Sequence, residues 1–218
     1  MAVSEPSLVV NEVYASIQGE SSYAGLPCVF VRLTGCNLRC TYCDTAYAFY
    51  DGERRTVASV VELVRGYGIS LVEITGGEPL VQKDCVVLAQ QLLDLGFNVL
   101  IETAGALPID VLPAGIIRIM DIKCPSSGES DKMDWSNIGH LTARDEVKFV
   151  IGNREDYDWA RGVIAKHALH EKCAVLISTV FGAVPSKDVV EWMLEDRLPA
   201  RFQLQLHKYI WDPKERGV

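Results

Sequence analysis

The sequence predicts an α/β fold, an open partial (β/α) barrel of mostly parallel strands. Three observations predict it: β-rich runs alternate with helical segments, the strands outnumber the clear helices, and the chain has only 218 residues. Alternating strands and helices indicate a parallel sheet. A closed barrel of eight strand–helix units usually needs about 250 residues, so an open barrel fits this length better. We expect a single domain over residues 1–218.

The expected strands are short apolar runs bounded by turn-forming residues. In chain order they cover residues 8–17, 28–33, 71–75, 99–103, 116–122, 147–151, 174–180 and 202–206. Runs that are apolar nearly throughout are typical of strands covered on both faces, as in a parallel sheet. We therefore expect these strands to form the buried centre of the fold.

Between the strands, apolar residues recur with the spacing of one helix face. Two such stripes are Val57, Val60, Val61 and Val64, and then Cys85, Leu88, Leu92 and Leu95. Thr56 precedes the first stripe as a candidate cap, and Gly96 stops the second. Further helices are expected over residues 155–168 and 186–196. Residues 124–139, rich in Pro, Gly, Ser and Asp, are expected to form a long loop.

Composition narrows the classes of function. Apolar residues make up 49% of the chain, and 29 Asp and Glu against 21 Lys and Arg give a net charge of −8. This charge opposes binding to nucleic acid or anionic lipid, so we expect no direct nucleic-acid partner and no membrane association. No stretch approaches the roughly 18 apolar residues of a membrane helix, and residues 1–10 lack a secretion signal's basic start. We expect a cytoplasmic protein.

Three of the seven cysteines, Cys36, Cys40 and Cys43, follow the strand that ends near Leu33. In parallel α/β folds the loops after the carboxyl ends of strands form the site, so this C-x3-C-x2-C loop lies where chemistry is expected. Structural zinc normally has four protein ligands, and no fourth ligand is evident. An iron–sulfur cubane normally takes four thiolates, so three cysteines leave one iron open for an exogenous ligand. The pattern favours a [4Fe–4S] cluster over zinc.

The cysteine loop resembles that of the radical S-adenosylmethionine (SAM) superfamily, in which the open iron chelates the amino and carboxylate groups of SAM. A second stretch, Thr75-Gly76-Gly77-Glu78-Pro79, follows an expected strand and resembles the superfamily's Gly-Gly-Glu motif. That motif holds the amino group of the cofactor's methionine moiety, and its glycines let a ligand approach the backbone closely. The alternative for this stretch alone is a tight strand-to-helix turn.

Further stretches narrow the resemblance to the 7-carboxy-7-deazaguanine synthase family and span nearly the whole chain. They are Ser16-Ile17-Gln18-Gly19-Glu20, Phe30-Val31-Arg32-Leu33-Thr34-Gly35, Asp44-Thr45, Glu102-Thr103-Ala104-Gly105, Asp121-Ile122-Lys123-Cys124-Pro125, Val147-Lys148-Phe149-Val150 and Gln205-Leu206-His207-Lys208-Tyr209. The resemblance implies a carbon–nitrogen lyase that contracts the ring of 6-carboxy-5,6,7,8-tetrahydropterin to 7-carboxy-7-deazaguanine. Ammonia is released, and the product serves queuosine or other 7-deazapurine biosynthesis.

The resemblance also implies the cofactors and partners. The cofactors are a [4Fe–4S] cluster, SAM and Mg²⁺, and the cofactor carries the radical chemistry, so no catalytic protein residue is expected. An external electron donor such as flavodoxin or ferredoxin is implied, together with a homodimer.

Site residues follow from the resemblance position by position. The implied substrate contacts are Ile17, Gln18, Gly19, Glu20, Arg32, Thr75, His207 and Pro213. The implied cofactor contacts are Tyr42, Cys43, Asp44, Gly77, Glu78, Glu102, Lys123 and Ser126. The implied cluster ligands are Cys36, Cys40 and Cys43, and the implied magnesium ligand is Thr45.

Several of these residues have alternative roles. A guanidinium can bind a carboxylate bidentately, so Arg32 suits the substrate's carboxylate, but it can also be a structural arginine paired at the sheet edge. Lys123 and Ser126 can belong to a turn whose polar groups serve only the backbone. Thr45 can cap a helix after the cysteine loop. Some family members place a terminal carboxylate near the substrate, whereas this chain runs five residues past Pro213.

Two other functions remain open. An activase that takes hydrogen from a glycine of a partner protein shares the cysteine loop and a similar size, but the stretches around Gln18 and His207 argue against it. A non-catalytic zinc-binding interaction protein explains the cysteines and leaves the Gly-Gly-Glu motif unexplained.

Overall fold

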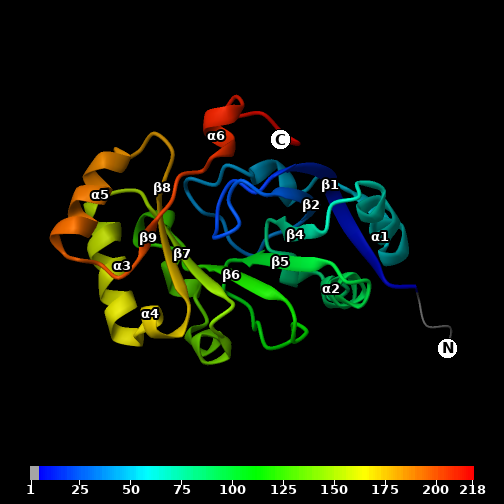
Figure 1. Cartoon of the computed structure of the whole chain (residues 1–218), viewed down its shortest axis with the longest axis horizontal. Coiled ribbons are helices and arrows are strands. Elements are labelled where there is room, and N and C mark those ends of the chain that lie inside the picture. The colour runs from blue at the N-terminus through cyan, green and yellow to red at the C-terminus, as the bar shows by residue number, and fades with distance from the viewer. Residues whose placement is uncertain (1–4) are drawn as a thin grey trace.

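The structure, a computed structural model, describes residues 5–218. Within that range nine strands form one sheet in the order β3-β1-β2-β4-β5-β6-β7-β8-β9 (Figure 1). The strands are β1 (Ser7–Ile17), β2 (Pro27–Leu33), β3 (Glu53–Thr56), β4 (Leu71–Gly76), β5 (Asn98–Thr103), β6 (Ile117–Asp121), β7 (Glu146–Ile151), β8 (Ala174–Thr179) and β9 (Arg201–Phe202). β1 pairs antiparallel with β2 and β3, and the neighbours from β2 to β9 are parallel. The predicted open arrangement of mostly parallel strands is confirmed.

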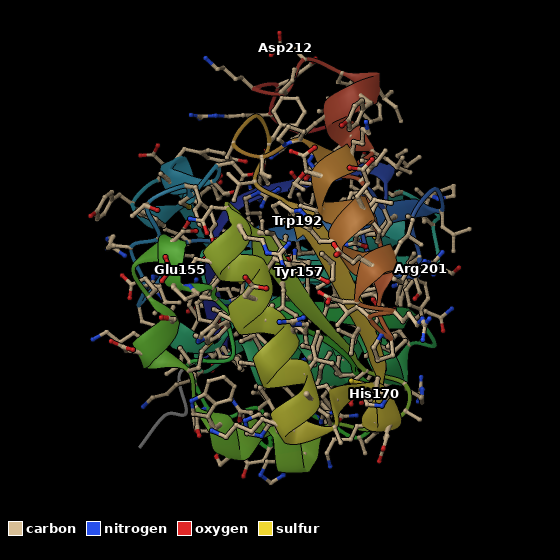
Figure 2. All side chains as sticks on the ribbon, turned by 90° about the vertical axis from the view of Figure 1, so that its left-hand side faces the viewer. Glu155, Tyr157, His170, Trp192, Arg201 and Asp212 are labelled. Atoms are coloured by element: carbon tan, nitrogen blue, oxygen red, sulfur yellow. The ribbon has the colours of Figure 1, made fainter. Side chains whose placement is uncertain are left out.

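The helices α1 to α5 lie along the sheet in two groups, and α6 lies apart from both. They are α1 (Val57–Gly66), α2 (Cys85–Asp94), α3 (Arg154–His167), α4 (Leu169–Lys172), α5 (Ser186–Glu195) and α6 (His207–Ile210). In Figure 1, α1 and α2 lie near β1, β4 and β5, whereas α3 and α5 lie at the end formed by β7 and β8. Figure 2 looks onto α3 and α5, which are joined where the Tyr157 hydroxyl donates to the Trp192 carbonyl and the Asp196 carboxylate, each at 2.9 Å.

Local signals predicted most element ends correctly. The Thr56 hydroxyl accepts a hydrogen bond from the Ser59 amide at 3.2 Å, as expected of a helix cap. The second predicted helix ends just before Gly96, whose φ of +85° suits glycine. Residues 124–139 contain no strand or α-helix, although short 3-10 turns occur at Pro125–Ser127, Ser130–Lys132 and Trp135–His140.

Two predictions about strands were wrong or incomplete. The expected strand at residues 202–206 is reduced to β9, because the chain then leaves the sheet and the Leu206 amide donates to the Gly19 carbonyl at 2.9 Å. β3 was not predicted, because its sequence Glu53-Arg54-Arg55-Thr56 has no apolar alternation. This edge strand depends on backbone pairing with β1.

The strand pleat divides the molecule into a core face and a site face. Successive side chains of a strand point to opposite faces. In β2, Val29 and Val31 are fully buried in the larger core, which also contains the apolar faces of α1 and α2. Phe30 and Arg32 point the other way, as do Glu73 and its neighbours at alternate positions of β4. Polar groups at the carboxyl ends of the strands therefore meet on the second face.

The cysteines outside the loop are packed in the protein interior. Cys28, Cys85, Cys124 and Cys173 are buried, and all seven cysteines of the chain are free thiols. Among residues 5–218, no helix has the length and apolar character needed to cross a membrane.

Candidate active site

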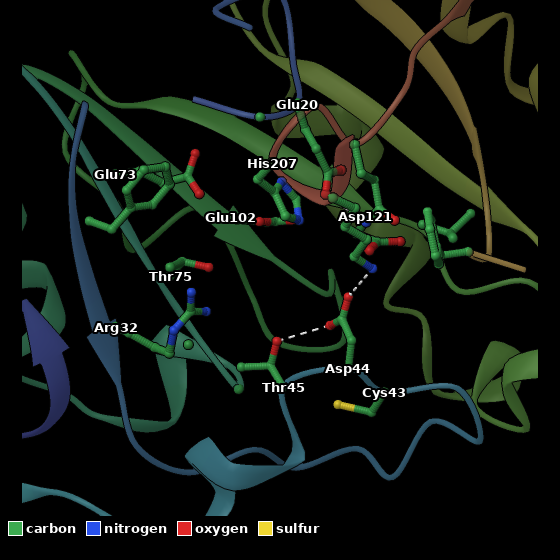
Figure 3. A pocket seen from close by; sticks show the side chains of 18 of the residues that line it. Glu20, Arg32, Cys43, Asp44, Thr45, Glu73, Thr75, Glu102, Asp121 and His207 are labelled. Atoms are coloured by element: carbon green, nitrogen blue, oxygen red, sulfur yellow. Dashed lines mark hydrogen bonds and ion pairs between the residues drawn. The ribbon is translucent and has the colours of Figure 1, made fainter. Parts of the chain in front are cut away.

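A cavity of about 630 Å³ opens at the carboxyl ends of the parallel strands. The structure brings most of the predicted site residues into its lining: Ile17, Gln18, Gly19, Glu20, Arg32, Cys36, Cys40, Tyr42, Cys43, Asp44, Thr45, Thr75, Gly77, Glu102, Lys123, His207 and Pro213. Figure 3 shows Arg32, Glu73 and Thr75 on the left, Glu20, Glu102 and His207 at the upper centre, and the segment with Cys43 and Thr45 at the bottom. Glu78 and Ser126 do not line the cavity.

The three loop cysteines all face this cavity and are partly exposed. The Cys43 amide donates to the Cys40 carbonyl at 3.2 Å, which closes a turn between the last two. Burial raises the pKa of the Cys40 thiol to about 11 and also raises the pKa of Cys36 and Cys43. The thiols are thus protonated near neutral pH, and a metal that binds them must displace their protons.

The Gly-Gly-Glu loop packs directly against the cysteine loop. A Cβ at Gly77 would overlap the Gly35 carbonyl and the Cys36 Cβ, so only glycine permits this approach. The Glu78 amide donates to the same Gly35 carbonyl at 2.9 Å. The two motifs that are far apart in sequence are therefore adjacent walls of one site.

The Glu78 carboxylate is buried behind the cavity wall. It accepts hydrogen bonds from the Ala104 amide at 2.7 Å, the Thr103 hydroxyl at 2.9 Å and the Leu80 amide at 3.0 Å. Burial raises the pKa of Glu78, although these donors favour the charged form. With these contacts Glu78 anchors the glycine loop to the end of β5, and its role as a direct cofactor contact stays a prediction.

Ser126 is likewise turned to the protein. Its amide donates to Asp156 Oδ1 at 2.9 Å, and its hydroxyl donates to Asp156 Oδ2. Lys123 differs, because it lines the cavity and pairs with Asp121 at 2.8 Å. The turn alternative therefore describes the contacts of Ser126 better than those of Lys123.

Arg32 has a carboxylate partner and a place in the cavity wall. Its Nε donates to Glu12 Oε1 at 2.7 Å, and Nη2 donates to the Tyr14 hydroxyl at 2.8 Å. The rings of Tyr14 and Tyr47 each lie 5.9 Å from its guanidinium carbon. Burial opposes the charge of Arg32, but the two tyrosines and Glu12 outweigh it and raise its pKa. Arg32 therefore pairs with Glu12 and also lines the cavity, where it can contact a ligand.

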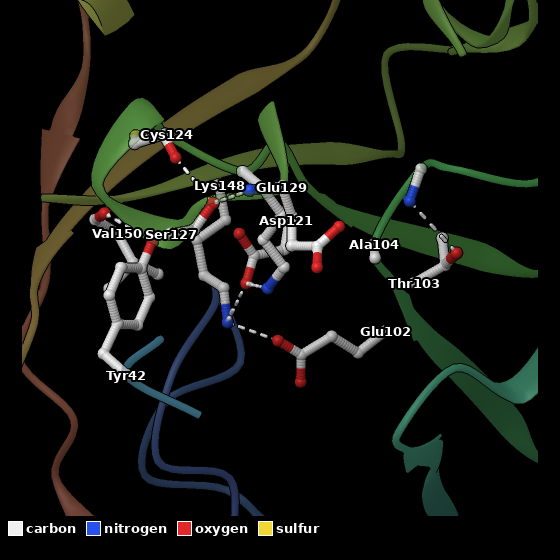
Figure 4. A network of polar contacts seen from close by, with 12 residues as sticks. Tyr42, Glu102, Thr103, Ala104, Asp121, Cys124, Ser127, Glu129, Lys148 and Val150 are labelled. Atoms are coloured by element: carbon white, nitrogen blue, oxygen red, sulfur yellow. Dashed lines mark hydrogen bonds and ion pairs between the residues drawn. The ribbon is translucent and has the colours of Figure 1, made fainter. Parts of the chain in front are cut away.

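A buried lysine that was not predicted as a site residue organises the acidic wall. Lys148 Nζ donates to Glu20 Oε2 at 2.8 Å. It also donates to the Glu102 carboxylate and lies 3.7 Å from Asp121 Oδ2 (Figure 4). Burial raises the pKa of Glu20, but the ion pair with Lys148 outweighs it, so the net shift is downward. Glu20 is therefore held as a carboxylate. The sequence feature that could have identified Lys148 as a site residue is a charged side chain within a buried, mostly apolar strand.

Two further contacts shape the same end of the cavity. Gln18 Nε2 donates to the Glu73 carboxyl, and Gln18 Oε1 accepts from the Glu20 amide at 3.0 Å. A Cβ at Gly19 would overlap His207 Nδ1, so glycine lets the imidazole pack on this loop. Burial lowers the pKa of His207 despite the nearby Glu20, which favours a neutral ring.

Asp44 and Thr45 close the cavity beside the cysteine loop. The Thr45 hydroxyl donates to Asp44 Oδ1 at 2.9 Å, and Lys208 Nζ contacts Asp44 Oδ2 at 2.6 Å (Figure 3). Burial opposes the charge of Asp44, but Lys208 outweighs it and lowers its pKa to about 2. Thr45 precedes the 3-10 turn Ala46–Phe49, yet its hydroxyl makes no capping hydrogen bond. The Thr45 hydroxyl therefore does not act as a helix cap, which was the alternative role for this residue.

The comparisons with known proteins agree with these motifs. A family model described as the Radical SAM superfamily matches residues 30–182. A 7-carboxy-7-deazaguanine synthase of Chlorobaculum tepidum is 45% identical over 217 residues, with 98% of this chain and 99% of the relative covered. One of Koribacter versatilis is 43% identical over 227 residues, with 96% and 99% covered. The crystal structure of QueE from Escherichia coli shares the fold, with a TM-score of 0.77 and 21% identity over 92% of this chain and 95% of that chain.

Proposed function

The chain belongs to the 7-carboxy-7-deazaguanine synthases of the radical SAM superfamily, and we propose that it converts 6-carboxy-5,6,7,8-tetrahydropterin to 7-carboxy-7-deazaguanine and ammonia. One observation carries the proposal: the three-cysteine loop, Arg32 and the Glu20–His207 wall line the same cavity. A cavity of about 630 Å³ lies within the usual range for small-molecule sites. We propose that the whole chain, residues 1–218, forms one catalytic domain.

The cysteines present fit a [4Fe–4S] cluster. Cys36, Cys40 and Cys43 are free thiols on one wall, and the other cysteines are buried. Among residues 5–218, no three Cys, His, Asp or Glu side chains converge as ligands of a single ion. An iron–sulfur cubane does not need the thiolates to converge on one point, because each thiolate binds a separate iron. When bound, the cluster and SAM supply a 5′-deoxyadenosyl radical that takes hydrogen from C6 of the substrate.

The protein's own share is to hold the reactants and exclude water. For SAM, we propose contacts from Tyr42, Asp44, Gly77, Glu102 and Lys123. The amide and carbonyl groups of the glycine loop suit an amino acid moiety, and Lys123 suits a carboxylate. Glu78 supports this surface from behind through its bonds to the end of β5.

For the substrate, we propose recognition at two ends. Arg32 binds the carboxylate with the edge of its guanidinium that Glu12 and Tyr14 leave available. At the other end Glu20, held ionised by Lys148, accepts from N–H groups of the pterin, and His207 packs on the ring. Gln18, Gly19 and Thr75 complete the contact surface. Substrates without a carboxylate should therefore bind weakly.

For magnesium, we propose that the Thr45 hydroxyl contributes one ligand. Mg²⁺ prefers oxygen ligands, keeps several waters and often takes further ligands from substrate oxygens. Thr45 lines the cavity, and its hydroxyl donates to Asp44 rather than capping the turn that follows. A hydroxyl that already faces the site can turn its lone pairs to an ion at little cost.

We further propose a cytoplasmic enzyme that receives electrons from an external donor such as flavodoxin or ferredoxin and acts as a homodimer. Seven free cysteines suit a reducing compartment. Cluster reduction needs an electron that the side chains around the cavity do not supply.

Anaerobic reconstitution tests the proposed function. We expect about four irons and four sulfides per chain and, with SAM, reductant and the carboxypterin, formation of 7-carboxy-7-deazaguanine. A zinc-binding interaction protein would take up about one zinc and form no product. A glycyl-radical activase would cleave SAM and leave the carboxypterin unchanged.

A further inference from the structure

The charge of Arg32 is already matched within the protein. Glu12 lies 2.7 Å from its Nε, on the paired position of the neighbouring strand. A carboxylate that approaches Arg32 therefore meets an ion pair whose net charge is about zero, and Glu12 repels it. A second cation of the protein beside this pair would offset the repulsion by Glu12.

A second cation lies at the same end of the cavity, on the segment formed by residues 212–218. The Arg216 guanidinium carbon lies 3.9 Å from the centre of the Tyr47 ring, the same ring that faces Arg32. The Tyr47 hydroxyl in turn donates to Glu12 at 3.0 Å. In Figure 1 the chain after α6 runs back toward the β1–β2 end of the sheet.

Arg216 differs from Arg32 in having no carboxylate partner among the ion pairs of residues 5–218. Arg216 lines the cavity, so its positive charge is available to a ligand there. The formal charges of the two preceding residues, Lys214 and Glu215, cancel each other.

We propose that Arg216 is a substrate-binding residue that supplies the second cation for the substrate's carboxylate, with Tyr47 fixing its guanidinium beside the Arg32–Glu12 pair. The inference rests on the proposed function and extends it. Arg32, Glu12, Arg216 and one substrate carboxylate then sum to zero charge. The segment after α6 thereby becomes part of the carboxylate specificity of the site.

The test compares binding of two ligands, 6-carboxytetrahydropterin and a tetrahydropterin without the carboxylate, to the reconstituted enzyme with SAM. Arg216→Gln should weaken carboxypterin binding about fivefold, the upper range for a partly exposed ion pair, and leave the second ligand within about twofold. The loss should shrink at high salt, because the cation is partly exposed. Arg216→Lys should recover part of the affinity.

Lys214→Gln is the matched control, because it removes one positive charge from the same segment without the Tyr47 contact. It should change carboxypterin affinity less than twofold. Equal weakening of both ligands by Arg216→Gln, no weakening of either, or the same loss in Lys214→Gln would overturn the role of Arg216. Wild-type enzyme that fails to bind or convert the carboxypterin would instead contradict the proposed function.

Discussion

Lys148 Nζ lies 2.8 Å from Glu20 Oε2, although the two residues are 128 positions apart in the sequence. Lys148 is on β7, whereas Glu20 is in the loop after β1, so the ion pair joins this loop to a strand that β2, β4, β5 and β6 separate from β1 in the sheet. Because Lys148 also contacts Glu102 and Asp121, one buried cation holds three acidic side chains in place.

Replacing Lys148 by Met should destabilise the protein and impair substrate binding. The change keeps much of the side chain's volume but leaves the carboxylates of Glu20 and Glu102 without their cation. Breaking a buried ion pair commonly costs about 3 kcal/mol or more. We expect a loss on the order of 2–3 kcal/mol in the free energy of unfolding at pH 7, because Glu102 is partly exposed. Anaerobic urea denaturation measures it.

Lys187→Met is the control for this change. Lys187 pairs with Glu191 on the exposed face of α5, where both side chains are mostly exposed. Its loss should cost less than about 0.5 kcal/mol. Equal effects of the two substitutions would mean that the Lys148 network contributes no more than a surface ion pair.

Replacing Glu73 by Gln should change how stability depends on pH. Burial, followed by the nearby Glu102, raises the pKa of the Glu73 carboxyl in the folded protein above its ordinary value of 4.5. The folded state therefore binds this proton more tightly than the unfolded state. The resulting stability is present below about pH 4.5 and is lost as pH rises through the raised pKa.

A neutral carboxamide at position 73 removes that dependence. The free energy of unfolding of Glu73→Gln, relative to wild type, should therefore rise between pH 5 and pH 8. Glu62→Gln, on the exposed side of α1, reports the effect of removing an ordinary surface carboxylate. A Glu73→Gln difference that stays constant over this range, or falls, would show that the Glu73 carboxyl is not held neutral by burial.

Replacing Thr45 by Val should separate magnesium binding from cluster assembly. Valine preserves the shape and removes the hydroxyl oxygen, so iron content should be unchanged. Since a misplacement of about 1 Å can cost on the order of a hundredfold in rate, turnover should fall even at saturating substrate. Activity should also lose its response to added Mg²⁺. Normal, fully magnesium-stimulated turnover would rule out Thr45 as the ligand.

Local sequence patterns predicted those parts of the fold and site that local chemistry determines. The C-x3-C-x2-C loop follows a buried strand and faces the cavity as expected, and the Thr56 cap begins α1. The strand pleat explains why Arg32 and Thr75 reach the site: both occupy inward positions near the ends of paired strands.

Features that depend on distant partners were not predictable in this way. β3 exists through pairing with β1, and its own residues carry no strand pattern. Glu78 belongs to a recognisable motif, but the donors at Thr103 and Ala104 that turn its carboxylate away from the cavity lie at the end of the next strand. The contact between Arg216 and Tyr47 likewise depends on how the last residues fold back.

In the proposed function, the three-cysteine loop drives ring contraction of a carboxypterin in this cavity. The most direct measurement is 7-carboxy-7-deazaguanine formed per chain by wild type, Cys40→Ala and Cys85→Ala after the same anaerobic reconstitution. Cys85 is the control, because it is buried in α2 away from the cavity. Wild type and Cys85→Ala should contain about four irons and form product with ammonia in equal amounts, whereas Cys40→Ala should form none. Product formation by Cys40→Ala at the wild-type rate, or none by fully reconstituted wild type, would contradict the proposed function.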